Sequence, residues 1–169
     1  MTAPNEVFCR LTADAAERAA AAELTCVSIP GLRATGVLER FMLGDSLVAV
    51  AVSDREVVGT VLSRPPDGLR GVLDAHALRR YHLLQYVAVA PRSRRSGVGR
   101  RLVALAGGEL PDLGVRWSFG GAENAAAGEF FAACGFAVLA PGALLPLPPS
   151  GRPELNARRP GYRWFWREW

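Results

Sequence analysis

The 169-residue chain contains no lysine and only one isoleucine. All of its basic side chains are therefore arginines, and the surplus of Ala, Gly, Arg and Pro is typical of a GC-rich coding sequence, so part of the arginine content says nothing about function. A formal net charge of +4 is too small to indicate nucleic-acid binding by itself. No apolar run reaches the roughly 18–20 residues that a membrane-spanning helix needs. We therefore expect neither a membrane protein nor a nucleic-acid-binding protein.

Cysteine is also scarce. Cys9, Cys26 and Cys134 are odd in number and share no metal-ligand spacing, so we expect no metal site and interpret all three as small buried residues in a reducing compartment. The first residues lack the charged-then-apolar pattern of a signal peptide, which favours a cytoplasmic protein.

Half of the residues are apolar, enough for the hydrophobic core of one domain, and no repeat or linker divides residues 1–169. Apolar periodicity alternates between strand-like and helix-like segments and predicts a single α/β domain with a mixed sheet. Gly107-Gly108 is expected to end the third helix. The expected strands are 6–11, 46–52, 56–62 (a hairpin with the preceding strand), 81–90, 115–119, 136–140 and 161–169, and the expected helices are about 14–26, 34–42, 99–106 and 124–134.

The last quarter of the chain is rich in proline and aromatic residues. Residues 141–160 hold six prolines and two glycines and are expected to form a loop, with an extended piece at 144–147 as an option. In the final strand Tyr162, Trp164 and Trp166 share one face, and Phe165 and Trp169 share the other. Aromatic residues on both faces favour a strand buried on both sides, and rings that line a substrate pocket or a homodimer contact remain alternatives.

One stretch combines a strand, a basic glycine turn and a helix start. The apolar run 83–90 ends at Pro91, five arginines fall within Arg92–Arg101, and a helix-period run follows. The first N–H groups of a helix have no intrahelical partner and favour an anion, and Gly97 and Gly99 let a phosphate approach the backbone. This layout predicts a site for a phosphorylated ligand, and a solvated arginine-rich face is the alternative.

Two other glycine motifs fit this stretch poorly. A dinucleotide-binding turn needs a third glycine where the chain has Leu102, and it follows its strand without a long basic loop. A nucleotide P-loop needs a Gly-Lys-Ser/Thr sequence, which a chain without lysine cannot contain.

The segment Arg94–Gly99 resembles the R/Q-x-x-G-x-G/A loop of the GCN5-related N-acetyltransferases (GNAT). Residues 124–136, Asn-Ala-Ala-Ala-Gly-Glu-Phe-Phe-Ala-Ala-Cys-Gly-Phe, resemble the second signature of that family, N-x-x-A-x-x-F-Y-x-x-x-G-F. The expected element order also agrees over nearly the whole chain: strand, helix, helix, strand, strand, strand, helix, strand, helix, strand, strand. The resemblance implies a GNAT-like fold and an acyl-CoA-dependent N-acetyltransferase.

The resemblance also implies how acetyl-CoA, the expected cosubstrate, is held. The pyrophosphate would sit on the N–H groups of the glycine loop, and backbone groups of the preceding strand would pair with the pantetheine arm and polarise the thioester carbonyl. Asn124 either holds the cofactor arm or simply caps its helix. The cofactor-binding residues implied are Val87, Ala88, Val89, Arg94, Arg95, Ser96, Gly97, Val98, Gly99, Arg100, Asn124 and Phe131.

The catalytic half departs from the family pattern. The usual tyrosine acid is replaced by Phe131, and the usual base position holds Gln85, which can orient a water but cannot take a proton near neutral pH. His82 would reach the site only if a bulge re-aimed it, and Tyr86 and Tyr81 are substitute acids. We take Gln85, His82 and Tyr86 as the catalytic candidates.

The acceptor is an amine on a small molecule or peptide that the sequence does not identify. Glu39, Asp45 and Asp74 lie in segments that border the acceptor site in the family and are candidates for recognising a cationic amine. Cys134 is interpreted as a core residue. A non-catalytic acyl-CoA-binding module of the same fold is the alternative function, and a nucleic-acid binder that uses the arginine loop is a weaker third.

Overall fold

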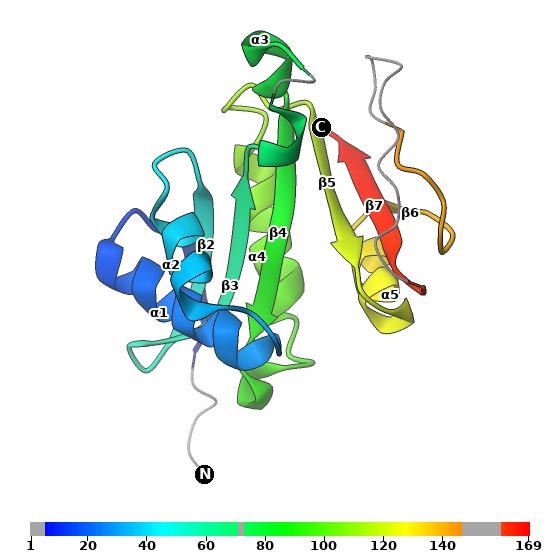
Figure 1. Cartoon of the computed structure of the whole chain (residues 1–169). Coiled ribbons are helices and arrows are strands. Elements are labelled where there is room, and N and C mark those ends of the chain that lie inside the picture. The colour runs from blue at the N-terminus through cyan, green and yellow to red at the C-terminus, as the bar shows by residue number, and fades with distance from the viewer. Residues whose placement is uncertain (1–5, 71–72, 147–159) are drawn as a thin grey trace.

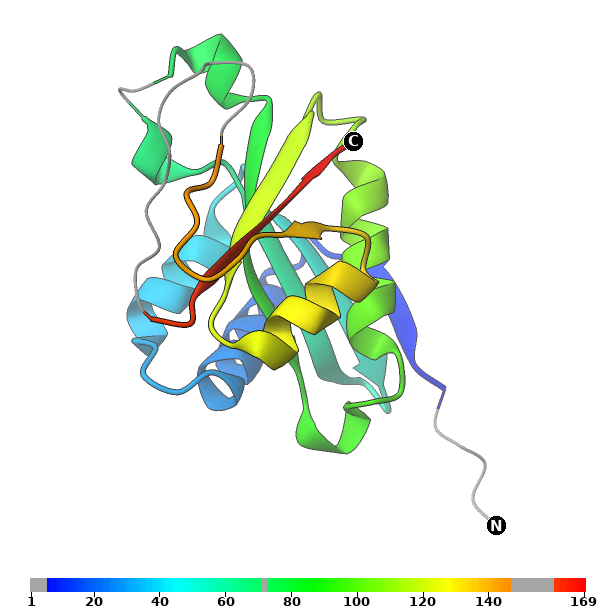
Figure 2. The ribbon, with the colours of Figure 1, turned by 90° about the vertical axis from the view of Figure 1, so that its right-hand side faces the viewer.

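The sheet is the frame of the molecule. The computed structural model describes residues 6–70, 73–146 and 160–169, and in this part of the chain seven strands form one mixed sheet in the order β1-β2-β3-β4-β5-β7-β6 (Figure 1). Helices α1 and α2 cover one face, and α4 and α5 cover the other (Figure 2). The expected α/β class, with a mixed sheet between helical layers, is confirmed.

The first four strands are antiparallel neighbours. The predicted hairpin is confirmed, since Ser53 pairs with Glu56 across a turn in which Asp54 and Arg55 take positive φ values of 50° and 65°. The near-continuous apolar run of β2 reflects burial on both faces of the sheet. The elements of this half are β1 (Phe8–Leu11), α1 (Ala15–Ser28), α2 (Ala34–Met42), β2 (Leu47–Ser53), β3 (Glu56–Arg64) and β4 (Tyr81–Val89).

The second half of the chain adds the last three strands of the sheet, beginning with a parallel one. β5 runs parallel to β4, and β7 lies antiparallel between β5 and β6. The predicted order holds, with three short helical turns added to segments that the pattern left unassigned or read as loop. The elements are η1 (Asp67–Leu69), α3 (Ala75–Leu78), η2 (Pro91–Ser93), α4 (Val98–Glu109), β5 (Trp117–Ala122), α5 (Ala125–Ala133), β6 (Ala137–Val138) and β7 (Arg163–Glu168).

The aromatic strand at the C-terminal end is buried on both faces, as expected. Trp164 packs with Tyr162 and Phe119 on the α2 side of the sheet, and Phe165 packs with the α4 and α5 residues on the other side. Most of the loop expected over 141–160, including the end of the extended piece at 144–147, lies outside the described residues.

The expected helix end at Gly107-Gly108 is wrong. α4 continues through both glycines to Glu109, and the left-handed turn comes later, at Gly114 with a φ of 78°. The indole of Trp169 lies against Gly107, so that a β-carbon there would be only 3.0 Å or less from three ring carbons. The indole Nε1 also donates a hydrogen bond to the hydroxyl of Ser118. Gly107 therefore serves close packing, which helical periodicity alone does not reveal.

The two adjacent glycines make a matched pair of tests. We expect Gly107→Ala to lower the free energy of unfolding by about 1–3 kcal/mol, because the new methyl group overpacks against Trp169. Gly108→Ala meets no atom within 4 Å and should raise stability by about 0.5–1 kcal/mol through helix propensity. Urea denaturation measures both, and equal values for the two variants would contradict the packing role of Gly107.

Candidate functional site

The backbones of β4 and β5 separate at the centre of the site, and the space between these backbones is called the opening below. The two strands pair over Tyr81–Leu83 and then diverge toward the C-terminal end of β4 (Figure 1). The N–H of Ala90 donates to the carbonyl of Val58 at 2.8 Å. Because hydrogen-bonded and non-bonded pairs alternate along antiparallel strands, the backbone groups of Val87 and Val89 point away from β3 and into the opening. The open edge can therefore pair with an extended ligand.

A left-handed loop joins β4 to α4 at the lower end of the opening. Arg95 and Gly97 have φ values of 61° and 81°, and Gly97 is the N-cap of α4, its carbonyl accepting the first helical bond from Arg101 N–H at 3.1 Å. The N–H groups of the first helical turn are left for a ligand. A β-carbon on Gly97 would meet nothing within 4 Å, so the space before this helix start is open. The loop is an anion site in form.

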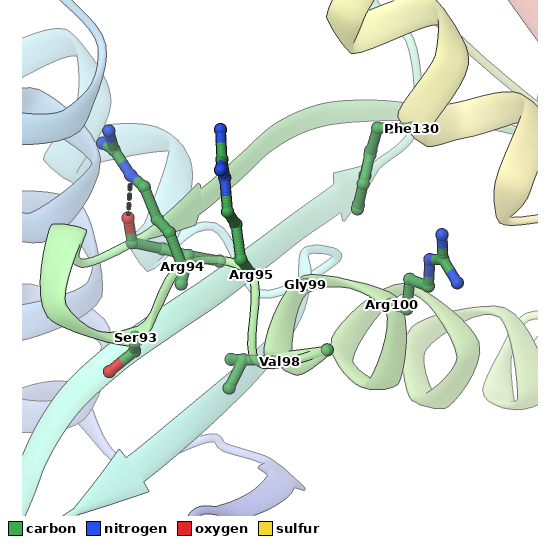
Figure 3. A pocket seen from close by; sticks show the side chains of 9 residues that line it. Ser93, Arg94, Arg95, Val98, Gly99, Arg100 and Phe130 are labelled. Carbon is green, nitrogen blue, oxygen red and sulfur yellow. Dashed lines mark hydrogen bonds between the residues drawn. The ribbon is translucent and has the colours of Figure 1, made fainter.

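Two adjoining cavities follow the loop and the strand edge. Their volumes are about 520 Å³ and 270 Å³, and they share Val89, Arg94, Gly99 and Phe130. Figure 3 shows the side chains of Arg94, Arg95 and Arg100 around the first cavity, with Phe130 facing them from α5. The first is also lined by Ser93, Arg95, Gly97, Val98 and Arg100, and the second by Ser28, Ile29, Val87, Ala88, Ala127 and Phe131.

The five arginines of the expected basic run divide into two groups. Arg94 is held by a 3.0 Å bond from its Nε to the carbonyl of Val89, and it lines the larger cavity together with Arg95 and Arg100. Arg92 pairs instead with Glu56, and Arg101 donates to the carbonyl of Val7 at 3.3 Å. Three of the five arginines therefore line the cavity, and all five side chains are exposed to solvent.

Phe130 is a wall of the site that sequence reasoning did not select, although it occupies a fixed position of the second signature. Its ring carbons would lie 3.2 Å and 3.3 Å from a β-carbon on Gly99, so Gly99 allows α4 and α5 to approach each other here. Ser93, Ser28, Ile29 and Ala127 were also missed. Nothing in the pattern connected the end of α1 with this opening.

Two of the expected cofactor residues do not line these cavities. The hydroxyl of Ser96 donates to the carbonyl of Ser93 at 2.7 Å. Asn124 is the N-cap of α5, and its Oδ1 accepts from Ala127 N–H at 2.9 Å. The cap, one of the two alternatives for Asn124, is the role that its geometry shows.

Gln85 occupies a bulge of β4 at the point where the opening begins. Leu62 pairs with Tyr86 and Ser63 pairs with Leu84, so Gln85 is the extra, unpaired residue. Its Oε1 accepts a 2.6 Å bond from Arg64 Nε, and its Nε2 lies 3.4 Å from the hydroxyl of Tyr86. The Tyr86 ring lies parallel to the ring of Phe41 in α2, with the two ring centroids 6.3 Å apart. Gln85 and Tyr86, two of the three catalytic candidates, are thus together on the α2 side.

His82, the third catalytic candidate, lies on the opposite face. The bulge falls after it, so it shares its face with Leu84, and it is 5% exposed. Its Nδ1 lies 3.1 Å from the hydroxyl of Ser63. Burial lowers the pKa of His82 from 6.5 to about 4, although the charge of Asp45 opposes the shift. A neutral, buried imidazole is the form present at neutral pH.

Three further residues that the sequence analysis discussed, Phe131, Cys134 and Tyr81, are at least partly buried in the fold. Phe131 stacks on Phe165 with ring centroids 3.7 Å apart. Burial raises the pKa of the Cys134 thiol, against the charges of Arg100 and Arg167, which favours the interpretation of Cys134 as a packing residue. Burial likewise raises the pKa of the Tyr81 hydroxyl, with the charge of Arg80 opposing it.

The acidic residues proposed for the acceptor side are occupied or exposed. Asp45 lies 3.9 Å from the guanidinium of Arg70. Asp74 caps α3 by accepting from Ala77 N–H at 2.7 Å, and Glu39 is exposed on α2. In residues 6–70, 73–146 and 160–169 no three His, Cys, Asp or Glu side chains are grouped to hold a metal ion. None of the helices in these ranges is long and apolar enough to cross a membrane.

Comparison with known proteins identifies related sequences and folds. Residues 44–138, more than half of the chain, match the family described as acetyltransferase (GNAT) domain. No protein with a curated description matches the sequence.

Three solved structures are similar in fold. A GNAT-family protein from Desulfovibrio desulfuricans superposes with a TM-score of 0.69 at 18% identity, over 96% of this chain and 99% of that one. GCN5 from Tetrahymena has a TM-score of 0.67 at 13% identity, over 93% and 94%. An acetyltransferase from Bacillus subtilis, solved in complex with CoA, has a TM-score of 0.64 at 13% identity, over 97% and 99%.

The buried state of His82 predicts a pH dependence of stability. Its folded pKa of about 4 lies below the unfolded value of about 6.5, so the unfolded chain binds the proton more readily between these values. The contribution of the neutral imidazole is fully present above pH 6.5, and about 3 kcal/mol at most is lost as the pH falls to 4.

We expect His82→Asn to lose less stability than the wild type between pH 6.5 and 4 in chemical denaturation. His76→Asn, which removes an exposed histidine, is the control and should follow the wild-type profile. Parallel profiles for the wild type and His82→Asn would show that His82 titrates normally.

Proposed function

Since the chain belongs to the GNAT acetyltransferase family, we propose that it transfers the acetyl group of acetyl-CoA to an amine acceptor by direct attack within a ternary complex. The observation that carries this proposal is the groove formed by the two adjoining cavities, which extend from the α4 helix start to the open edge of β4, with three arginines around the wider cavity. The basic cavity suits the phosphates of CoA, and the narrower cavity along the strand edge suits its pantetheine arm.

The wider cavity is the proposed pyrophosphate site. The N–H groups at Gly97 to Arg100 would bind the phosphate oxygens, and the helix dipole and the guanidinium groups of Arg94, Arg95 and Arg100 would stabilise their charge. A glycine at the N-cap, with open space in front of it, lets the phosphates lie directly on the backbone. Ser96 lies in the loop before this helix, and Val98 is the first residue of α4.

The narrower cavity is the proposed site of the pantetheine arm. The N–H groups of Val87 and Val89 and the carbonyl of Val87 would hydrogen-bond the arm as a neighbouring strand would, whereas the carbonyl of Val89 already accepts from Arg94. Phe130 and Phe131 provide an apolar wall. An N–H of this strand edge would polarise the thioester carbonyl and stabilise the oxyanion that forms on attack. Asn124 retains its cap role and is not assigned to the cofactor.

The reaction requires few groups from the protein. The nitrogen lone pair of the acceptor attacks the thioester carbon, the carbon–sulfur bond breaks, the ammonium proton passes to water and the CoA thiolate takes up a proton. Gln85 and Phe131 cannot exchange these protons, and His82 is buried on the far face. We therefore assign most of the rate to the alignment of the two substrates and to carbonyl polarisation. Gln85 and Tyr86 are the proposed contacts of the acceptor.

A second candidate function is an acyl-CoA-binding module without catalysis. It is favoured by the same two departures, Phe131 at the usual acid and Gln85 at the usual base. The cytoplasmic location, the organisation of 1–169 as one domain and the homodimer stay predictions from the sequence.

Calorimetry with acetyl-CoA tests the cofactor site. We expect the wild type to bind with a dissociation constant of about 1 μM and Gly97→Asp to weaken binding by at least about 100-fold, because it places a carboxylate where the pyrophosphate should lie. Gly114→Asp is the matched control, since Gly114 also has a positive φ and an open environment but is remote from the groove. Absent binding by the wild type, or equal binding by all three proteins, would contradict the proposed site.

Thiol release separates the enzyme from the module. With acetyl-CoA and a panel of amines, we expect release of free CoA thiol that depends on one class of amine and disappears in Gly97→Asp. Tight acetyl-CoA binding without amine-dependent release for any class of amine would favour the non-catalytic module.

A further inference from the structure

On the α2 side of the opening, Arg64 holds the side-chain amide of Gln85 through a hydrogen bond, and we call this contact the clamp. Resting on the proposed function, we propose that Arg64 is a positioning residue that fixes the amide of Gln85 with its N–H donors toward the acceptor, so that the site takes weakly basic amines in their neutral form, such as an α-amino group, in preference to a lysine-type ammonium.

The orientation of the Gln85 amide follows from its partner. The guanidinium of Arg64 offers only donors, so the atom that it contacts at 2.6 Å must be the carbonyl oxygen of Gln85. Arg64 is itself immobilised, since its Nη2 lies 2.6 Å from Asp67 Oδ2, its Nη1 donates to the carbonyl of Pro65 at 3.4 Å, and its side chain is 6% exposed. The hydrogen bond from Arg64 also holds the pKa of the Asp67 carboxyl below its usual range.

The amide nitrogen is then the free end of the Gln85 side chain. Its Nε2 has one long contact, at 3.4 Å, with the hydroxyl of Tyr86, and Gln85 is partly exposed in the bulge where the opening begins. An alkylammonium carries three donors and no acceptor, so it needs oxygen atoms around it. The lone pair of a neutral amine must stay available for the attack, so Gln85 can donate instead to a carbonyl oxygen on the carbon next to the amine-bearing carbon, as beside an α-amino group. A lysine-type amine has no such oxygen close to its nitrogen. The clamp thus favours an α-amino acceptor over a lysine-type amine.

The charges around the clamp act in the same direction. Arg64 and Arg70 both contact Asp67, Arg40 of α2 also acts on its charge, and Asp45 lies 3.9 Å from Arg70. The cluster around Asp67 therefore brings together three guanidinium groups and two carboxylates, and its Arg64 contacts Gln85 directly. An excess of positive charge disfavours an incoming ammonium ion. His82 cannot accept a hydrogen bond from an ammonium ion here, because it is buried on the other face of the sheet.

Basicity then selects among amines. At pH 7 about one in ten α-amino groups is neutral, against fewer than about one in a thousand lysine-type amines, from ordinary pKa values of about 8 and 10.4. With no proton acceptor among the described residues at the reacting centre, kcat/KM should follow this neutral fraction. We expect a preference of at least about tenfold for an α-amino acceptor at pH 7, with kcat/KM rising with pH toward the pKa of each amine.

A single isotope label tests the clamp without turnover. Gln85 is the one glutamine of the chain, so 15N at the glutamine amide yields one pair of N–H resonances. We expect this pair to shift in Arg64→Met and to return toward the wild-type position in Arg64→Lys, which can still donate to Oε1. Acetyl-CoA affinity, measured in the same variants, should stay within about twofold because Arg64 lines neither of the two cavities. An unshifted pair in a folded Arg64→Met would overturn the clamp.

The acceptor preference has two separate readouts. In the CoA-loaded wild type, alaninamide should move the Gln85 resonances at concentrations at which Nα-acetyl-lysinamide does not, and thiol release should show the same preference. When kcat/KM is expressed per neutral amine, so that the difference in basicity cancels, the preference that remains should fall at least threefold in Arg64→Met. Equal effects of both amines in the wild type would overturn the inference even if acetyl transfer occurs. A selective shift without thiol release from any amine would instead contradict the proposed catalysis and leave the clamp standing.

Discussion

The site depends on the loss of pairing between two neighbouring strands. β4 and β5 share a register over Tyr81–Leu83 and then separate, which leaves the backbone groups of Val87 and Val89 without a strand to bond. Phe131 of α5 stacks on Phe165 of β7 in the same cluster as these two valines, so apolar rings support the separated strands. A sheet edge that opens inside the fold is protected from aggregation and still offers main-chain hydrogen bonds to a ligand.

Small residues let the surrounding elements approach this opening. Gly99 lets Phe130 reach the start of α4, and Gly107 lets Trp169 pack on the same helix two turns later. In β5, a β-carbon on Gly120 would lie 2.7 Å from the carbonyl oxygen of Leu84, and one on Gly121 would collide with the hydroxyl of Tyr162. These glycines act through the absence of a side chain, whereas Gly97 acts through its left-handed backbone conformation.

Charge is distributed unevenly between the two ends of the opening. At the α4 end, Arg94, Arg95 and Arg100 line a cavity whose lining contains no acidic side chain, which suits a polyanion. At the bulge end, the guanidinium of Arg64 is neutralised in part by Asp67 and holds an amide in place of the carboxylate or imidazole that would serve as a base. In the proposed function the first end would bind by charge, and the second would select by hydrogen-bond polarity.

The sequence by itself determined the fold class, the order of the elements, the hairpin and the position of the glycine loop before α4, because these depend on periodicity, turn chemistry and local spacing. Only the tertiary structure decided which arginines face the groove, since Arg92 and Arg101 bind partners 36 and 94 residues away. It also decided that Gln85 and its chain neighbour Tyr86 lie on the same face, and that Arg64, 21 residues earlier on the neighbouring strand β3, fixes Gln85. A bulge shifts the side-chain alternation by one residue, and a long-range hydrogen bond leaves no periodic trace in the chain, so neither can be read from local pattern.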